Sequence, residues 1–299
     1  MKNILIPTDF SKNAWNAVTY AIALYDNEDC NFYLLNTYTP SISNSRFMAS
    51  MAYDEAEIVQ NYSKEGLSHL LHKIKANYHN PKHNFTTISS FNLLVDEVKE
   101  IIEQYTIEMV ILGSKGASGL AEVFMGSNAV RIIKAVKSCP VLAIPEYFDF
   151  EKPTEIAFAT DFNRFYTPSE LEPIMNLATT FNSVLRIVHV QYEIKALTDV
   201  QQFNLNMLRK YLGEVEHYIH TITELHSVSK TLEVFVAELD VHLLAMLNYQ
   251  HSYMERMTRE PVIEKMAFHT RTPLLVIPEL GMRASSKQKK AQDFISEKN

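Results

Sequence analysis

The chain has 299 residues, 46% of them hydrophobic, and a formal net charge of −7. This length favours two domains, and the negative charge provides no basic surface of the kind that binds nucleic acid or anionic lipid. Two cysteines give no disulfide framework, no apolar run reaches the roughly 18 residues of a membrane span, and the first residues do not resemble a signal peptide. We therefore expect a cytoplasmic protein with neither nucleic acid nor a membrane among its partners.

The first half alternates short apolar runs with helical patterns. Five runs predict strands, at residues 3–7, 32–38, 84–89, 109–112 and 141–144. Apolar residues at helical spacing fill the intervals, in segments that begin after Ser11, near residue 54, at Leu94 and after Gly126, and Ser11 can cap the first of these helices. Continuous apolar strands that alternate with helices predict an α/β fold, in which a five-stranded parallel sheet is covered by helices on both faces.

The second half repeats the first. ILIPTDFS at 4–11 recurs as IAFATDFN at 156–163, and CPVLAIPE at 139–146 recurs as TPLLVIPE at 272–279. An internal repeat of this length predicts two tandem copies of one doubly wound fold. We place the first domain at 1–148 and the second at 149–281, and we expect the charged tail at 282–299 to be disordered.

One segment of the second half is ambiguous. Residues 232–238 have the β-branched content of a strand, but apolar residues there also follow helical spacing. A strand would leave no room for the crossover helix that a parallel pair needs, whereas a strand at 217–223 restores the spacing of the first half. We therefore predict a helix. Thr167, Pro168 and Glu170 predict a capping box at the start of the first helix of this half.

Four of the seven glycines lie in the stretch LGSKGASGLAEVFMGSNAV, residues 112–130. It joins a predicted strand to a helix at the carboxyl edge of the sheet, where open α/β folds bind ligands. Gly113 and Gly116 permit a tight turn and a close approach of backbone N–H groups to an anion. Gly126 and Ser127 open the next helix, whose free N–H groups suit a phosphate. The alternative interpretation is a tight turn with a helix cap.

The glycine spacing G-x-x-G, nine residues, G-S is neither the dinucleotide fingerprint nor the Walker motif. It resembles the ATP-binding branch of the universal stress protein family, in its tandem form, and the resemblance extends to about residue 280. It implies an adenine nucleotide alpha hydrolase-like fold and bound ATP, with Mg²⁺ held through the phosphates.

The resemblance assigns the nucleoside side of the site to the ends of three strands. Pro7, Thr8 and Asp9 match the segment in which the Asp meets the ribose and the neighbouring backbone meets adenine. Thr37 matches a residue that packs on the base, and Leu112 matches one that touches adenine or ribose. An Asp after a strand is also a common turn or helix cap, but the nearby glycine loop favours the ligand role for Asp9.

The phosphate side is assigned to the glycine loop. Gly113 and Gly116 would contact the phosphates, and Gly126, Ser127 and Asn128 the terminal phosphates. Lys115 is either a phosphate ligand or an ordinary surface lysine.

The second half lacks this loop. Residues 246–268 contain no glycine, and Arg259, Glu260 and Pro261 align with Gly126, Ser127 and Asn128. A carboxylate at the helix N-terminus would repel a phosphate. We therefore predict one nucleotide per chain, held by the first half, with the second half as a partner or regulatory domain. The last strands, 140–145 and 273–278, are edges that can pair into an intrachain pseudo-dimer, and the chain can associate further into a homodimer.

Three functions fit these observations. The first is an ATP-binding sensor or signalling module of the stress response, acting together with a protein partner. The second is a slow ATPase or autophosphorylating protein, for which the sequence offers no catalytic base. The third is a non-binding scaffold for protein contacts. Histidine spacing gives no metal site, and Cys139 is expected to be a buried apolar residue rather than a nucleophile.

Overall fold

The structure is a computed structural model, and it describes residues 1–38, 53–114, 127–193, 195–248, 262–263, 266 and 271–279. The chain divides into two compact units. Most of the first is Met1–Phe150 and most of the second is Glu151–Met266, with the last strand belonging to the second. The glycine loop from 115 to 126 and the tail at 282–299 lie outside the described residues.

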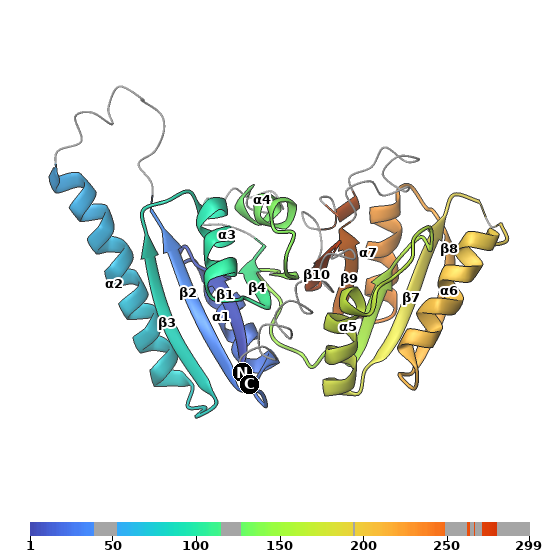
Figure 1. The fold of residues 1–299 in the computed structure, drawn as a ribbon, viewed down its shortest axis with the longest axis horizontal. Helices are drawn as coiled ribbons and strands as arrows, with labels where there is room; N and C mark the ends of the chain where they lie inside the picture. The colour runs from blue at the N-terminus through green and yellow to red at the C-terminus, as the bar shows by residue number, and fades with distance from the viewer. Residues whose placement is uncertain are drawn as a thin grey trace, which may run out of the picture. The chain divides into compact units, whose positions relative to one another are not determined.

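The first unit is built on a parallel sheet with the strand order β3-β2-β1-β4-β5 (Figure 1). Its strands are β1 (Lys2–Pro7), β2 (Cys30–Thr37), β3 (His83–Ser90), β4 (Met109–Gly113) and β5 (Val141–Ile144). Strands β1, β4 and β5 are buried along most of their length, which is why they appear in the sequence as continuous apolar runs.

Four helices connect these strands: α1 (Lys12–Leu24), α2 (Tyr53–Asn77), α3 (Leu94–Gln104) and α4 (Ser127–Ala135). Right-handed crossovers carry the chain from β1 out to β3 through α1 and α2, and back through α3 and α4, so the two helix pairs cover opposite faces. The cap predicted at Ser11 is present, since its side chain accepts a hydrogen bond from the Ala14 amide. The predicted α/β fold, with a five-stranded parallel sheet, is therefore confirmed.

The second unit repeats this plan. Its parallel sheet has the order β10-β9-β6-β7-β8. The strands are β6 (Glu155–Ala159), β7 (Val184–Gln191), β8 (His217–Thr223), β9 (Leu243–Asn248) and β10 (Leu274–Pro278), and the helices described in full are α5 (Pro168–Phe181), α6 (Asp199–Leu212) and α7 (Val228–Glu238). The ambiguous residues 232–238 form the end of α7, and 217–223 form β8, so the helical interpretation is confirmed.

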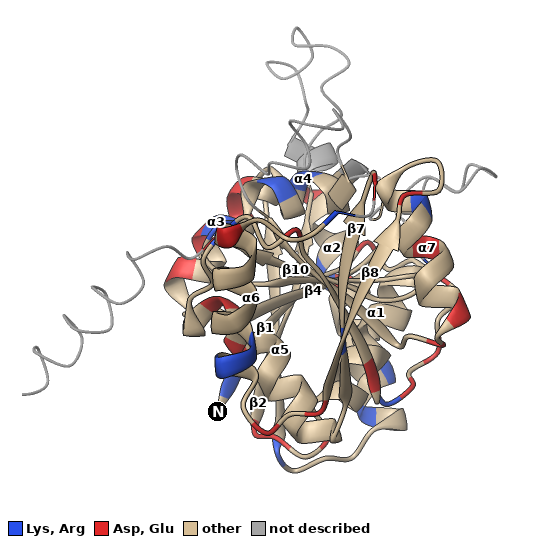
Figure 2. Cartoon of the chain, turned by 90° about the vertical axis from the view of Figure 1, so that its right-hand side faces the viewer, with Lys and Arg blue, Asp and Glu red and all other residues tan. Residues whose placement is uncertain are grey.

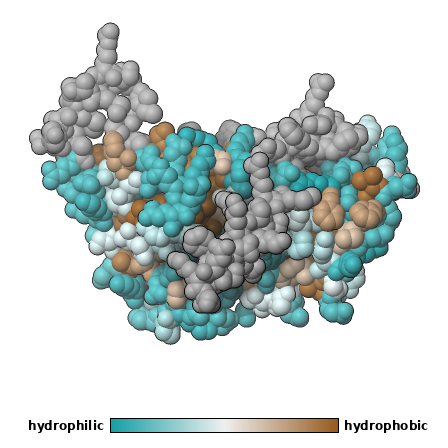
Figure 3. All heavy atoms as spheres, in the orientation of Figure 1, coloured by the Kyte–Doolittle hydropathy of each residue, from teal (hydrophilic) through white to brown (hydrophobic). Residues whose placement is uncertain are grey.

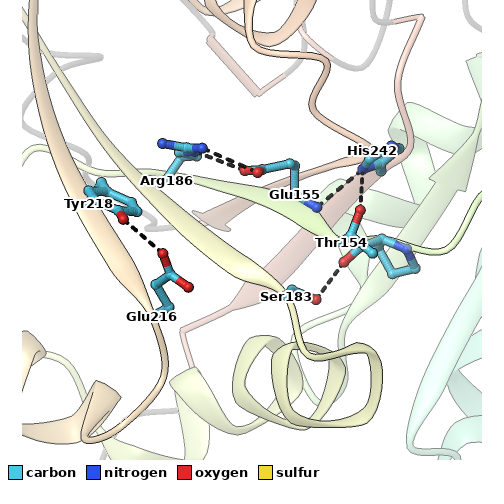
Figure 4. Close-up of polar contacts among 8 residues, drawn as sticks. Thr154, Glu155, Ser183, Arg186, Glu216, Tyr218 and His242 are labelled. Carbon is cyan, nitrogen blue, oxygen red and sulfur yellow. Dashed lines mark hydrogen bonds and ion pairs between the residues drawn. The ribbon is translucent and has the colours of Figure 1, made fainter.

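A polar network crosses the amino end of the second sheet (Figure 4). Arg186 on β7 forms a two-pronged ion pair with Glu155 on β6, at 2.8 and 3.2 Å, and lies 5.0 Å from the ring of Tyr218 on β8. The Glu155 amide donates to Nδ1 of His242, at 3.1 Å. Carboxylate–arginine pairs that share two hydrogen bonds are well ordered, so this network fixes the register of β6, β7 and β8 at the edge opposite their carboxyl ends.

The described surface is mixed in charge in the view of Figure 2 and mostly hydrophilic on the face drawn in Figure 3. Acidic and basic residues are interspersed in the view of Figure 2, and apolar side chains form only small patches in Figure 3. No helix among the described residues is both long enough and apolar enough to cross a membrane.

Candidate functional site

A cleft of about 260 Å³ opens at the carboxyl edge of the first sheet. Its described lining comes from the ends of β1, β2 and β4, from the starts of α1 and α3, and from α4. The lining residues are Pro7, Thr8, Asp9, Ala14, Asn36, Thr37, Leu93, Leu94, Leu112, Gly113, Asn128, Ala129, Arg131 and Ile132. The structure thus brings seven of the eleven predicted site residues into one cavity: Pro7, Thr8, Asp9, Thr37, Leu112, Gly113 and Asn128.

The other four predicted residues belong to the glycine loop. Lys115, Gly116 and Gly126 lie outside the described residues. Ser127 is the first residue of α4, as the sequence predicts, and so lies at the helix terminus beside Asn128. A helix that begins at the cleft directs its unpaired N–H groups toward any bound anion.

The turn after β1 is held by its own side chains. The Phe10 amide donates to Oγ1 of Thr8 at 3.1 Å, and the Ser11 amide donates to Oδ1 of Asp9 at 3.0 Å. Phe10 has a φ of 63°, in the left-handed region. The two hydrogen bonds, each between residues two positions apart, hold that conformation. Asp9 therefore acts as a turn cap and at the same time lines the cleft, so the two interpretations of this residue are compatible.

The end of β2 is tied to the same turn. Nδ2 of Asn36 donates to the Thr8 carbonyl oxygen at 2.7 Å, and the Thr8 amide donates to the Leu35 carbonyl at 2.8 Å. The sequence interpretation selected Thr37 and passed over Asn36. The available signal was an amide side chain directly after the apolar run of β2, next to Thr37 at the carboxyl end of the strand.

The geometry gives Gly113 a packing role in addition to the one expected from the sequence. A Cβ at this position would lie 2.7 Å from Cγ and Nδ2 of Asn13, and 3.0 Å from the Asn13 backbone carbon. Asn13 is buried on α1. The missing side chain of Gly113 therefore makes room for α1 to pack on β4, and its contribution to the cleft is its backbone.

Sequence reasoning also missed Leu93 and Arg131. Leu93 is the N-cap residue of α3 and is 42% exposed, an unusual position for a leucine, and together with Leu94 it forms an apolar wall of the cleft. Arg131 lies one helical turn after Ser127, on the side of α4 that faces the cleft. Its spacing from Ser127 was the signal that could have identified it.

The turn after β6 in the second unit has the same conformation and the same two side-chain hydrogen bonds as the turn after β1 in the first unit. The Phe162 amide donates to Oγ1 of Thr160, and the Asn163 amide donates to Oδ1 of Asp161 at 3.0 Å. Phe162 has a φ of 57°. Asp161 is buried, however, whereas Asp9 is exposed.

Four additional residues follow this turn in the second unit. The N-cap of α1, Ser11, comes two residues after Asp9, whereas the N-cap of α5, Thr167, comes six residues after Asp161. The inserted residues 163–166 end in Tyr166, which is 1% exposed and bonds Oγ1 of Thr160 at 2.5 Å through its hydroxyl. The threonine that lines the cleft in the first unit therefore has a counterpart that contacts a buried tyrosine.

The position of Asn36 is taken by His189 in the second unit. Nδ1 of His189 lies 3.1 Å from the Thr160 carbonyl, which can only accept, so Nδ1 carries the proton. Nε2 is buried without a hydrogen-bond partner in the described part of the chain. Burial lowers the pKa of His189, and its bond to the Thr160 carbonyl opposes that shift without reversing it.

The other reactive side chains form no second centre among the described residues. No group of three or more His, Cys, Asp and Glu residues there could hold a metal ion. Burial raises the pKa of the Cys139 thiol to about 12, and burial likewise raises the pKa of Cys30 to about 12. Thiols with such values carry almost no thiolate at neutral pH and are poor nucleophiles.

Comparison with known proteins agrees with this architecture. The model of the universal stress protein family matches residues 1–145. A universal stress protein of Methanocaldococcus jannaschii is 27% identical over 143 residues, which are 48% of this chain and 81% of that protein.

Two solved structures resemble nearly the whole chain. A universal stress protein from Archaeoglobus fulgidus has a TM-score of 0.66 at 17% identity, covering 93% of this chain and 96% of that one. A functionally unknown protein from Pseudomonas aeruginosa has a TM-score of 0.59 at 10% identity, covering 98% of both chains. At such identities the likeness establishes the fold alone. The first half of the chain thus matches the universal stress protein family, and the chain as a whole has the fold of the Archaeoglobus protein.

Proposed function

We propose that the cleft of the first unit binds an adenine nucleotide, ATP with Mg²⁺ held through its phosphates, and that the protein is a nucleotide-binding sensor or signalling module. The observation that carries this proposal is the convergence of Pro7, Thr8, Asp9, Thr37, Leu112, Gly113 and Asn128, chosen from separate segments of the sequence, on one cavity. The family match over residues 1–145 supports it.

The cleft has two chemically different ends. Leu93, Leu94 and Leu112 offer apolar surface to a base, and Asp9 offers a carboxylate to ribose hydroxyls. Asn128 and Arg131, at the start of α4, offer polar and cationic groups to phosphates. A mostly apolar wall with a few convergent polar groups is the usual composition of a small-molecule site.

The second unit is proposed to bind no nucleotide at the equivalent place. Tyr166 is buried against Thr160, and Phe158 lies 6.0 Å from its ring in an edge-on arrangement. This side-chain packing fills the space beside Thr160, the counterpart of the cleft-lining residue Thr8. The second unit would then serve as the partner or regulatory part of the chain, and pairing of the two last strands stays a prediction.

A signalling role requires that the nucleotide favour one conformation over another, because a ligand shifts an equilibrium only by its differential affinity. The described lining offers less support for hydrolysis. Its one carboxylate, Asp9, already accepts the Ser11 amide, and the described lining contains no histidine that could activate water.

Asp9 and Asp161 provide a matched test of this proposal. Each aspartate accepts the amide of the residue two positions later in the same turn, so Asp9→Ala and Asp161→Ala both remove this turn bond, while only Asp9 lines the cleft. We expect Asp9→Ala to weaken Mg-ATP binding by about tenfold or more, as expected for loss of a charged hydrogen bond. Asp161→Ala should bind as the wild type does.

Isothermal titration calorimetry gives the affinity and the stoichiometry, which we expect to be about one nucleotide per chain. Mass spectrometry of nucleotide released from the purified protein identifies the ligand. Thermal unfolding of both variants controls for loss of fold. Absence of binding in the wild type, or equal weakening by the two substitutions, would overturn the proposal.

A further inference from the structure

The described lining of the cleft contains one cation, Arg131 on α4. Four residues of this helix line the cavity, and two of them, Ala129 and Ile132, are buried at 2% and 1% exposure and fix the helix against the sheet. Arg131 lies between them in sequence and is exposed. The backbone that carries its guanidinium group is therefore held rigidly beside the cleft, while the group itself can reach a ligand.

The direction in which side chains leave a helix places the Arg131 guanidinium near the start of α4. Cα–Cβ bonds in an α-helix tilt toward the N-terminus, so a long side chain covers the turn that precedes it. For Arg131 that turn is Ser127, Asn128 and Ala129, which contains no acidic residue. The guanidinium and the unpaired N–H groups of the first turn then act on the same small region, and both attract anions.

The charges of the described lining are unequally distributed. Arg131 is its one cation and Asp9 its one anion, and Asp9 is at the end of β1, where it accepts the Ser11 amide. The end of the cleft formed by α4 is thus positive. A planar guanidinium pairs with phosphate oxygens through two parallel hydrogen bonds, a geometry that lysine does not reproduce.

The second half of the chain reverses this charge. In the alignment that places Arg259 opposite Gly126, the residue opposite Arg131 is Glu264. The half whose sequence lacks the glycine motif therefore also carries an acid at the corresponding place. This sequence difference is independent of the cavity and agrees with a phosphate-directed role for the arginine.

We infer that Arg131 binds the phosphates beyond the first, so that it makes the affinity of the cleft depend on the length of the phosphate chain and selects di- and triphosphates over monophosphates and nucleosides. This inference rests on the proposed nucleotide function and adds to it the residue that determines phosphate number. Arg131 contacts the ligand directly and has no part in holding the base.

The test compares adenosine, AMP, ADP and ATP in calorimetric titrations of the wild type, Arg131→Gln, Arg131→Lys and the control Lys137→Gln. Lys137 follows α4, is exposed and does not line the cleft, so its substitution removes one positive charge without altering the site. We expect Arg131→Gln to weaken ATP by about tenfold to a hundredfold and ADP by less, as for loss of a charge-assisted pair.

Adenosine and AMP should bind Arg131→Gln within about twofold of the wild type, Arg131→Lys should recover part of the loss, and Lys137→Gln should resemble the wild type. Equal weakening of all four compounds would indicate a structural role and overturn the inference, as would unchanged ATP binding. In either case the nucleotide proposal would survive. Failure of the wild type to bind any of the four compounds would overturn both.

Discussion

Gly113 shows how a single missing methyl group connects the site to the packing beneath it. Its absent Cβ would lie 2.7 Å from the side chain of Asn13. We expect Gly113→Ala to destabilise the first unit by about 1–3 kcal/mol, the usual cost of overpacking a filled interior, measured by urea unfolding. The same substitution in an Asn13→Ala background should cost less, because the colliding Cγ and Nδ2 are gone. Equal costs in the two backgrounds would show that Asn13 does not set the penalty.

His189 should make the second unit sensitive to acid. Its folded pKa lies below the unfolded value of about 6.5, since burial disfavours the charged ring. Above about pH 6.5 the His189 ring is neutral in both the folded and the unfolded state, so its titration does not change the free energy of unfolding. As the pH falls through that value the unfolded chain takes up a proton that folded His189 does not, so stability declines until the folded pKa is reached.

His189→Asn is expected to reduce this decline, measured as the free energy of urea unfolding between pH 8 and pH 5. Asparagine is the residue at the equivalent position, where Asn36 donates to the Thr8 carbonyl, so the bond to the Thr160 carbonyl can be kept. Part of the decline should remain, because burial and the nearby Arg186 also lower the pKa of His220. An unchanged pH dependence in the variant would exclude His189 as its source.

Some residues of the site could be predicted from sequence motifs, whereas others could be identified only from the three-dimensional structure. Asp9 lies two residues after β1 and Gly113 ends β4, and both belong to recognisable motifs, so their location at one edge could be predicted. Leu93 and Asn36 carry no motif, and their place in the cleft depends on the pairing of β2 beside β1 and on the point where α3 begins. The packing of Gly113 on Asn13 could not be predicted, because it joins two elements whose separation the sequence does not specify.

At the scale of elements, α5 begins with a capping box whose glutamate is buried. The Glu170 amide donates to Thr167 Oγ1, Glu170 Oε2 accepts the Thr167 amide at 2.9 Å, and the Glu170 side chain is fully buried with Arg164 at 2.9 Å. The capping box of α6, at Thr198 and Gln201, is exposed. The two boxes are chemically similar and differ chiefly in burial.

We expect Thr167→Ala to cost about 1–2 kcal/mol of unfolding free energy, and Thr198→Ala about 0.5–1 kcal/mol. The difference arises because removal of Thr167 leaves a buried carboxylate with one partner fewer. Urea unfolding of both variants, in parallel with the wild type, measures the two costs. A larger loss at Thr198 would contradict the role assigned to burial.

Most elements were predictable because their patterns are strong. Both capping signals, at Ser11 and Thr167, correspond to real helix starts. The ambiguous residues 232–238 could be assigned only through the spacing of the repeat, since their β-branched content favours a strand and packing of Leu232 and Phe235 in the core makes them helical. Here the tertiary context overrides local propensity.

At the scale of the whole molecule, the two units show how far one fold can change. Their strand orders and turns correspond, but the inserted residues 163–166 fill the place beside Thr160 with Tyr166. The repeat made the duplication evident from the sequence. The insertion was visible there too, as a longer interval between Asp161 and the Thr167 cap, but only the structure shows that it ends in a buried ring bonded to the threonine.

The turns at Thr8 and Thr160 have a consequence for how such a duplicated protein diverges. Each turn is closed by bonds within the same short peptide and does not need a ligand to hold its shape. A copy that acquires a bulky residue beside this turn can therefore keep its backbone conformation. Loss of an ancestral ligand then costs the copy little folding stability. Such a copy can evolve a different function.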